Sequence, residues 1–179
     1  TSINSEIVHG IPSGRILKKG DILGIDLGIK WQKYHTDTAT TIGIGRIDFT
    51  KQQLIQITKR ALDEAIKKIK PGIHLGDVQN DIQNIVEDSG YSVIRDLSGH
   101  GIGQELQESP TIPNFGKKGT GPVLLEGMVL AIEPMVSVGD WHVKISKDGW
   151  TVIIADGSLG AHFEHTVVVT KNGYDVLTL

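Results

Sequence analysis

The stretches ILGIDLG (residues 22–28) and YHTDTATTIGI (residues 34–44) decide the fold of this chain. Both are rich in β-branched residues, and a polar turn around Lys30–Lys33 separates them, which predicts a β-hairpin. Each stretch carries one acid inside its apolar run, Asp26 in the first and Asp37 in the second. A hairpin turn lets two such positions face each other on neighbouring strands, within side-chain reach. The sequence therefore predicts a pair of carboxylates held together in a sheet.

The last third of the chain repeats this arrangement. Glu133 lies in GMVLAIEPMV (127–136) and Glu164 lies in HFEHTVVVT (162–170), two more strand-like runs. Burying a carboxylate without compensation is expensive, and the chain offers no comparable set of buried-looking Lys or Arg residues. A bound metal centre is the most economical explanation for four such acids.

One histidine extends this set of acids. His100 lies among the glycines of Gly99–Gly103, which indicates a close approach of the backbone to something. Oxygen-rich ligation with one imidazole favours Mn, Fe, Co or Zn. Four carboxylates are too many for one catalytic zinc, and they suit two ions about 3.5–4 Å apart that share bridging carboxylates. Such a pair of ions supports hydrolytic chemistry.

Each residue taken alone also has an ordinary explanation. A strand Asp is more often a turn or edge residue, and Trp150 packs in the core by default. His9, in a loop, is about as often a satisfied surface histidine as a site residue. The run Gly99–Gly103 lacks the final Gly-Lys-Ser/Thr of a phosphate loop. Strand alternation points His165 away from Glu164. No set of ligand-type residues accompanies the remaining histidines, His35, His74, His142 and His162.

The middle of the chain predicts two helices. Thr50 with Gln53 forms a capping box, and a helical apolar period follows until Pro71-Gly72. A second amphipathic helix is expected from about Leu75 to Ser89. The Gly/Pro-bearing segment 98–126 is predicted to be a long connection. Further strands are expected at 91–94, 127–136, 150–155, 162–170 and 174–178, so the fold class is α+β.

Composition limits the classes of function. With 179 residues, the chain is expected to form a single domain, 1–179. The net charge of -3, without a Lys/Arg cluster, argues against nucleic-acid specificity. No apolar run approaches the ~20 residues of a membrane span. The absence of cysteine and of a signal-like start predicts a cytoplasmic protein.

These motifs, taken together, resemble a known family. Along its full length the chain is similar to the type I methionine aminopeptidases of the pita-bread fold. Glu164-His165-Thr166 and the linker at 119–122 (GTGP) distinguish it from the related proline-specific peptidases. The resemblance implies a pseudo-two-fold antiparallel sheet with helices packed on its outer face. The matching stretches are NSEIVHGIP (4–12), GDILGIDLG (20–28), YHTDTATT (34–41), SGHGIGQEL (98–106), IPNFGKKGTGPVLLEGMVLAIEPMV (112–136), DGWTVI (148–153) and FEHTVVVT (163–170).

The resemblance implies removal of N-terminal methionine from peptides and nascent proteins by a water activated on two divalent ions. Asp37 and Glu164 would bridge the ions, and Glu133 would also handle the proton of the attacking water. His9 would contact the substrate near the scissile amide, and Trp150 would line the pocket for the methionine side chain. The five implied metal ligands are Asp26, Asp37, His100, Glu133 and Glu164.

Two neighbouring residues depart from the family pattern. Gln107 occupies the position of a second histidine that polarises the scissile carbonyl in the family. A glutamine amide donates a hydrogen bond but cannot carry charge or shuttle a proton, so we expect weakened activity. Leu106 stands where an aromatic residue is common in the family, so the methionine pocket is expected to differ. Both residues are predicted to bind substrate, and Gln107 also to act in catalysis.

The N-terminal segment of the family has no counterpart in this chain, so the helices that back the first half of the fold are expected to be missing. The sheet with Asp26 and Asp37 should then expose an apolar face. The chain is expected to be either a monomer or associated with a partner through this face. The ribosome is a further partner that the resemblance allows. The alternative function is a catalytically impaired domain of this fold that binds peptides or proteins without turnover.

Overall fold

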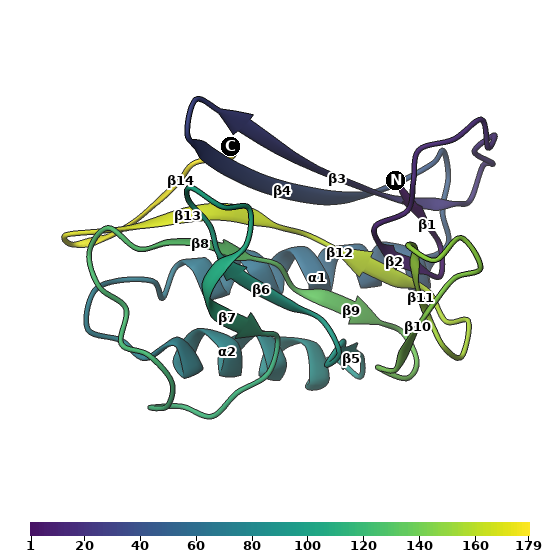
Figure 1. Cartoon of the computed structure of the whole chain (residues 1–179). Helices are drawn as coiled ribbons and strands as arrows, with labels where there is room; N and C mark the ends of the chain where they lie inside the picture. The colour runs from purple at the N-terminus through teal and green to yellow at the C-terminus, as the bar shows by residue number, and fades with distance from the viewer.

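A computed structural model describes all of residues 1–179 and confirms the predicted α+β class. Figure 1 shows a long hairpin lying across one side of a layer of antiparallel strands, with two helices packed beneath that layer. Its elements are β1 (Ser2–Ile3), β2 (Glu6–Val8), β3 (Ile22–Trp31), β4 (Tyr34–Gly43), α1 (Phe49–Ile66), α2 (Leu75–Glu87), β5 (Ser92–Val93), β6 (Ser98–Gly101), β7 (Glu108–Pro113), β8 (Val129–Ile132), β9 (Met135–Ser137), β10 (Val143–Ile145), β11 (Val152–Ile154), β12 (Gly160–His162), β13 (His165–Thr170) and β14 (Gly173–Val176).

The predicted hairpin is confirmed as β3 and β4. The two strands pair without a register shift from Ile22 and Gly43 to Trp31 and Tyr34. Asp26 lies opposite Ala39, and Asp37 lies opposite Gly28, so the two acids are diagonal neighbours rather than direct partners.

Both predicted helices are present, with differences at their ends. The predicted capping box at Thr50 is wrong, because the carboxylate of Asp48 accepts a hydrogen bond from the Lys51 N–H at 2.9 Å and caps α1. Helix α1 ends at Ile66, one turn before Pro71. At the start of α2, the His74 N–H donates to the carboxylate of Asp77 at 3.0 Å.

The connection predicted for 98–126 is wrong in part, because it contains β6 and β7. These strands pair with each other, and β6 also pairs with β8. The glycines of β6, which weaken the sequence signal for a strand, allow this packing. A Cβ at Gly99 would collide with the Ala131 carbonyl, and one at Gly101 with the Ser109 carbonyl. The strand expected at 127–136 is divided into β8 and β9, and the one at 162–170 into β12 and β13. The short strands β1, β2 and β10 were not predicted.

The core lies between the helices and the strands. Twenty-two buried apolar residues form one cluster, to which α1 contributes Leu54 and Leu62, α2 contributes Ile82, and the strands contribute Leu130 and Val167. A second cluster of six joins the N-terminal strands to the last third: Ile7, Val8, Ile94, Met135, Val152 and Ile154. No helix is both long and apolar enough to cross a membrane.

The hairpin exposes the apolar face that the sequence predicted. Its exposed apolar side chains, which we call the outer hairpin face, are Leu27, Ile29, Trp31, Tyr34 and Ile42. Alternation along β3, together with the β3–β4 register, places them on the face opposite Asp26. Trp31, at the end of β3, is 73% exposed.

Candidate metal centre

A row of residues crosses the hairpin into the second half of the chain. Asp26 lies opposite Ala39 in the β3–β4 ladder, and Ala39 forms an isolated antiparallel bridge with Glu164. Directly opposed residues of antiparallel strands point to the same face of the sheet. Asp37, two residues before Ala39, shares that face. Three of the predicted ligands are thus brought to one surface by register alone.

The same register extends to Glu133. The pairing of β8 with β13 ends at Ile132 opposite His165, and the pairing of β9 with β12 begins at Met135 opposite His162. The register is unchanged across this gap, so Glu133 and Glu164 oppose each other where Pro134 interrupts the ladder.

His100 reaches the same face from β6. It pairs with Ala131, two residues before Glu133, so it is a diagonal neighbour of Glu133. The structure therefore brings all five predicted ligands together on adjacent strands.

Threonine hydroxyls join the hairpin to the second half beside this row. The Thr166 hydroxyl donates to the Asp37 carbonyl and accepts from the Asp37 N–H, each at 2.8 Å. The Thr38 hydroxyl donates to the Glu164 carbonyl at 3.0 Å. Because these bonds hold the backbone of two predicted ligands, the acids are fixed relative to one another across the two halves.

The side chains of the predicted ligands lie close together, as the register indicates. One ligand atom from each of Asp37, His100 and Glu164 lies within 4.8 Å of the others. His100 Nε2 lies 3.6 Å from Glu133 Oε1. His162 Nε2, outside the predicted set, lies 3.3 Å from Glu133 Oε2.

The electrostatics of this cluster call for a cation. Burial, together with the charges of Glu133, Asp37 and Asp26, raises the pKa of Glu164 to about 10. Burial and the charges of Asp26 and Glu133 likewise raise the pKa of Asp37. No lysine or arginine forms an ion pair with any of the four acids. Four carboxylates without a lysine or arginine partner fit a divalent metal ion.

The histidine is oriented for the same purpose. His100 Nδ1 lies 2.9 Å from the Gly101 carbonyl oxygen, which accepts its N–H. This hydrogen bond assigns the proton to Nδ1 and leaves the Nε2 lone pair facing the acids, the usual arrangement of a metal-binding imidazole. The donor set therefore fits the metal pair that the resemblance implies.

Gln107 and Leu106 lie near this cluster. Gln107 lines a polar hollow of about 320 Å³ together with His100. Leu106 lies over Gly28, where an added Cβ would be 3.5 Å from both Leu106 Cδ1 and Asp37 Oδ1. Both predicted substrate residues therefore lie on the approach to the acids.

His9 and Trp150 form a separate pair. Their ring centroids are 5.8 Å apart, and Trp150 is 60% exposed, so the default expectation of a core tryptophan is wrong. His9 has a positive φ of 63°, a strained conformation for a residue other than glycine. No hydrogen bond or ion pair joins these two side chains to the five predicted ligands.

His162 is the residue of this region that sequence reasoning missed. Only 3% of it is exposed, and it faces Glu133. The available signal was its position two residues before Glu164, which by alternation puts both side chains on one face. His165 lies on the other face as expected, where its Nδ1 contacts the Thr178 hydroxyl at 3.0 Å.

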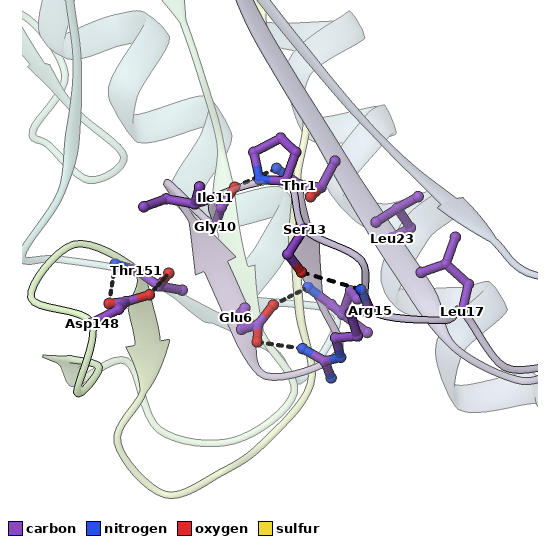
Figure 2. Close-up of a pocket in the computed structure, with 12 residues that line it drawn as sticks. Thr1, Glu6, Gly10, Ile11, Ser13, Arg15, Leu17, Leu23, Asp148 and Thr151 are labelled. Atoms are coloured by element: carbon purple, nitrogen blue, oxygen red, sulfur yellow. Dashed lines mark hydrogen bonds and ion pairs between the residues drawn. The ribbon is translucent and has the colours of Figure 1, made fainter.

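A larger hollow elsewhere contains none of these residues. It measures about 440 Å³ and lies beside the chain start, where Arg15 Nη1 meets Glu6 Oε1 at 2.6 Å (Figure 2). Asp148 and Thr151 close one side of it. Its lining contains none of the five predicted ligands.

The chain belongs to metallopeptidase family M24, whose model matches residues 1–171, and the four carboxylates and one imidazole on one face of the sheet fit this class. Within that family its close relatives are methionine aminopeptidases. That of Clostridium perfringens is 48% identical over 99% of this chain and 72% of its own length. The crystal structure of methionine aminopeptidase from Thermotoga maritima has a TM-score of 0.98 and 52% identity, covering 99% of this chain and 72% of that one.

The related peptidases of the fold are more distant. Prolidase from Pyrococcus furiosus has a TM-score of 0.80 and 29% identity, and it is covered over 48% of its length against 99% of this chain. The predicted pita-bread fold and the resemblance to methionine aminopeptidases are therefore confirmed. About a quarter of the length of the methionine aminopeptidases has no counterpart in this chain.

Proposed function

We propose that this chain is a cytoplasmic, dinuclear metallo-aminopeptidase that removes methionine from the N-termini of peptides and nascent proteins. The observation that carries the proposal is the strand register that gathers four acids and His100 on one face, without a lysine or arginine ion pair to neutralise them. The similarity to methionine aminopeptidases supports methionine as the residue removed.

The five predicted ligands are proposed to hold two ions of Mn, Fe, Co or Zn. When bound, such a pair polarises the scissile carbonyl and lowers the pKa of the attacking water. Asp37 and Glu164, the most central acids by register, would be shared between the ions. Asp26 would complete one set of ligands, and His100 with Glu133 the other.

Glu133 is the proposed general base. It lies between His100 and His162, and each of its oxygens faces one imidazole, at 3.6 Å and 3.3 Å. A carboxylate in a defined position accepts a proton from the attacking water and returns it to the leaving amine.

Four residues are proposed to bind the substrate. Leu106, beside Asp37, and Trp150 would contact the methionine side chain. His9, whose ring centroid is 5.8 Å from that of Trp150, would contact the scissile amide. The Gln107 amide, in the hollow with His100, would donate a hydrogen bond to the developing oxyanion.

The direct test is hydrolysis of Met-Ala-Ser by the purified chain with added Co²⁺ or Mn²⁺. We expect release of free methionine that depends on the metal and is abolished by a chelator. Absence of hydrolysis by both the native chain and Gln107→His would reject the peptidase.

Gln107 also favours a second candidate, a peptide-binding domain without turnover. Its amide cannot shuttle a proton, so the hollow beside His100 could retain affinity while losing catalysis. Tight binding of Met-Ala-Ser without product, measured by calorimetry, would support this candidate over the enzyme.

A further inference from the structure

His162 has a buried ring nitrogen without a hydrogen-bond partner, close to Glu133. The residue is 3% exposed, and its Nε2 is buried without a hydrogen-bond partner of good geometry. Glu133 Oε2 lies 3.3 Å from this nitrogen. Buried polar groups are nearly always paired, so an unpaired ring nitrogen this close to a carboxylate calls for an explanation.

The strands place Glu133 between two imidazoles. His100 on β6 is its diagonal neighbour on one side, and His162 on β12 is its diagonal neighbour on the other. One side chain therefore faces Oε1 and the other faces Oε2. The two histidines bracket the carboxylate within one face of the sheet.

The backbone of His162 is fixed as firmly as that of the predicted ligands. Its N–H donates to the Thr41 hydroxyl at 3.0 Å, and its carbonyl accepts from the same hydroxyl at 2.8 Å. Thr41 lies on β4, the strand that carries Asp37. The ring is thus presented from a rigid strand, which suits a residue that orients another.

His162 also lies outside the compact donor group. That group comprises Asp37, His100 and Glu164, whereas the His162 ring lies beside Glu133 Oε2. Its side chain is therefore placed to orient Glu133.

We propose that His162 is a positioning residue: its Nε2–H donates to Glu133 Oε2 and so directs Oε1 toward His100 and the metal. The proposal rests on the metal centre of the proposed function. Partners that orient metal ligands in this way typically contribute 10–100-fold in metal affinity.

The test compares two variants of the whole chain, His162→Phe, which keeps a ring but removes the donor, and His162→Gln, which keeps a donor. Co²⁺ binding is measured by calorimetry and by the visible absorption of the bound ion, and the folding of each metal-free variant by thermal unfolding. His142→Phe, at an exposed histidine, is the matched control.

We expect His162→Phe to lower Co²⁺ affinity by about 10–100-fold and to change the absorption spectrum, while His162→Gln and His142→Phe stay close to the native chain. Should His162→Phe fail to fold, His162→Asn replaces it, because its shorter amide cannot reach Glu133.

Native affinity and spectrum in the variant without a donor would overturn the proposal. Equal losses in His162→Gln would also overturn it, because an amide donor would then fail to rescue. If the native chain itself binds no Co²⁺, the metal centre fails, and this result is distinct from an unchanged variant.

Discussion

Ala39 and Glu164 exchange two backbone hydrogen bonds: the Glu164 N–H donates to the Ala39 carbonyl at 2.9 Å, and the Ala39 N–H donates to the Glu164 carbonyl at 3.3 Å. This bridge joins the hairpin to the second half of the chain at the point where the acids converge. Ala39 is buried, and its methyl group lies between Asp26 and Glu164 on the face that carries both carboxylates.

A larger side chain at Ala39 should therefore block the centre. We expect Ala39→Leu to project into the space between the two acids and to abolish Co²⁺ binding, at a cost of about 1–3 kcal/mol in stability from overpacking. Calorimetric titration with Co²⁺ measures the effect. Thr40→Leu, exposed on the opposite face of the same strand, is the control that should bind normally. Normal Co²⁺ binding by Ala39→Leu would contradict the placement of Ala39 between Asp26 and Glu164.

Removal of one central acid should disable catalysis. We expect Glu164→Gln to lower kcat/KM for Met-Ala-Ser by about 10²–10⁴-fold, because the metal pair supplies several kcal/mol of transition-state stabilisation. Steady-state kinetics with saturating Co²⁺ measures this loss. Glu126→Gln, at an exposed acid, should leave the rate unchanged. A fall of less than tenfold in Glu164→Gln would argue against its role as a ligand.

The metal-free protein should lose stability as pH rises. The pKa of Glu164 is raised from 4.5 to about 10 by burial and neighbouring acids, so the folded state retains a proton that the unfolded state releases. Its stabilising contribution is full below about pH 4.5 and is lost as pH rises toward 10. The raised pKa of Asp37 changes stability with pH in the same direction.

Thermal unfolding in the presence of a chelator tests this linkage. We expect a lower Tm at alkaline than at mildly acidic pH, and a weaker dependence in Glu164→Gln, which cannot ionise. Metal binding should release protons and strengthen with pH, since the ligands must be deprotonated. A Tm of the metal-free chain that rises over this range would contradict the assigned direction.

Restoring an imidazole at position 107 should raise activity. Gln107 shares a hollow with His100, so a histidine there faces the same space. Loss of one oxyanion donor costs about 10²–10³-fold and an amide is a partial substitute, so we expect Gln107→His to raise kcat by about tenfold or more. Gln107→Ala should lower it further. Equal rates for all three side chains would exclude the residue from the reaction.

The outer hairpin face should control self-association. Its five exposed apolar side chains, which include Ile29 and Trp31, lie on one side of β3 and β4. We expect Ile29→Lys combined with Trp31→Lys to shift the chain toward monomer in light scattering after size-exclusion chromatography. Gln32→Lys, in the turn, adds a charge outside the outer hairpin face and is the control. A native chain that is already monomeric at high concentration would contradict this expectation.

The parts of the fold with local signals could be predicted from sequence. The hairpin was evident because β-branched runs flank a polar turn, and the helices because their apolar period is long. Strands β6 and β7 were missed because glycine and proline lower local strand propensity. Their pairing with β8 is a long-range contact, and the glycines serve it by allowing close approach.

The candidate site was predictable in composition but not in detail. Asp26, Asp37, Glu133 and Glu164 stood out because each is an acid in an apolar strand. Their common face depends on the Ala39–Glu164 bridge and on the register kept across Pro134, and neither is a local property of the chain. His162 was missed for the same reason, since its partner Glu133 lies on another strand.

The most direct test of the account is a crystal structure of the chain soaked with Co²⁺ or Mn²⁺, with anomalous scattering collected at the metal edge. We predict two anomalous peaks between the hairpin and β13, surrounded by Asp26, Asp37, His100, Glu133 and Glu164. A folded, metal-soaked chain with no peak there, or with these side chains pointing apart, would contradict the central claim.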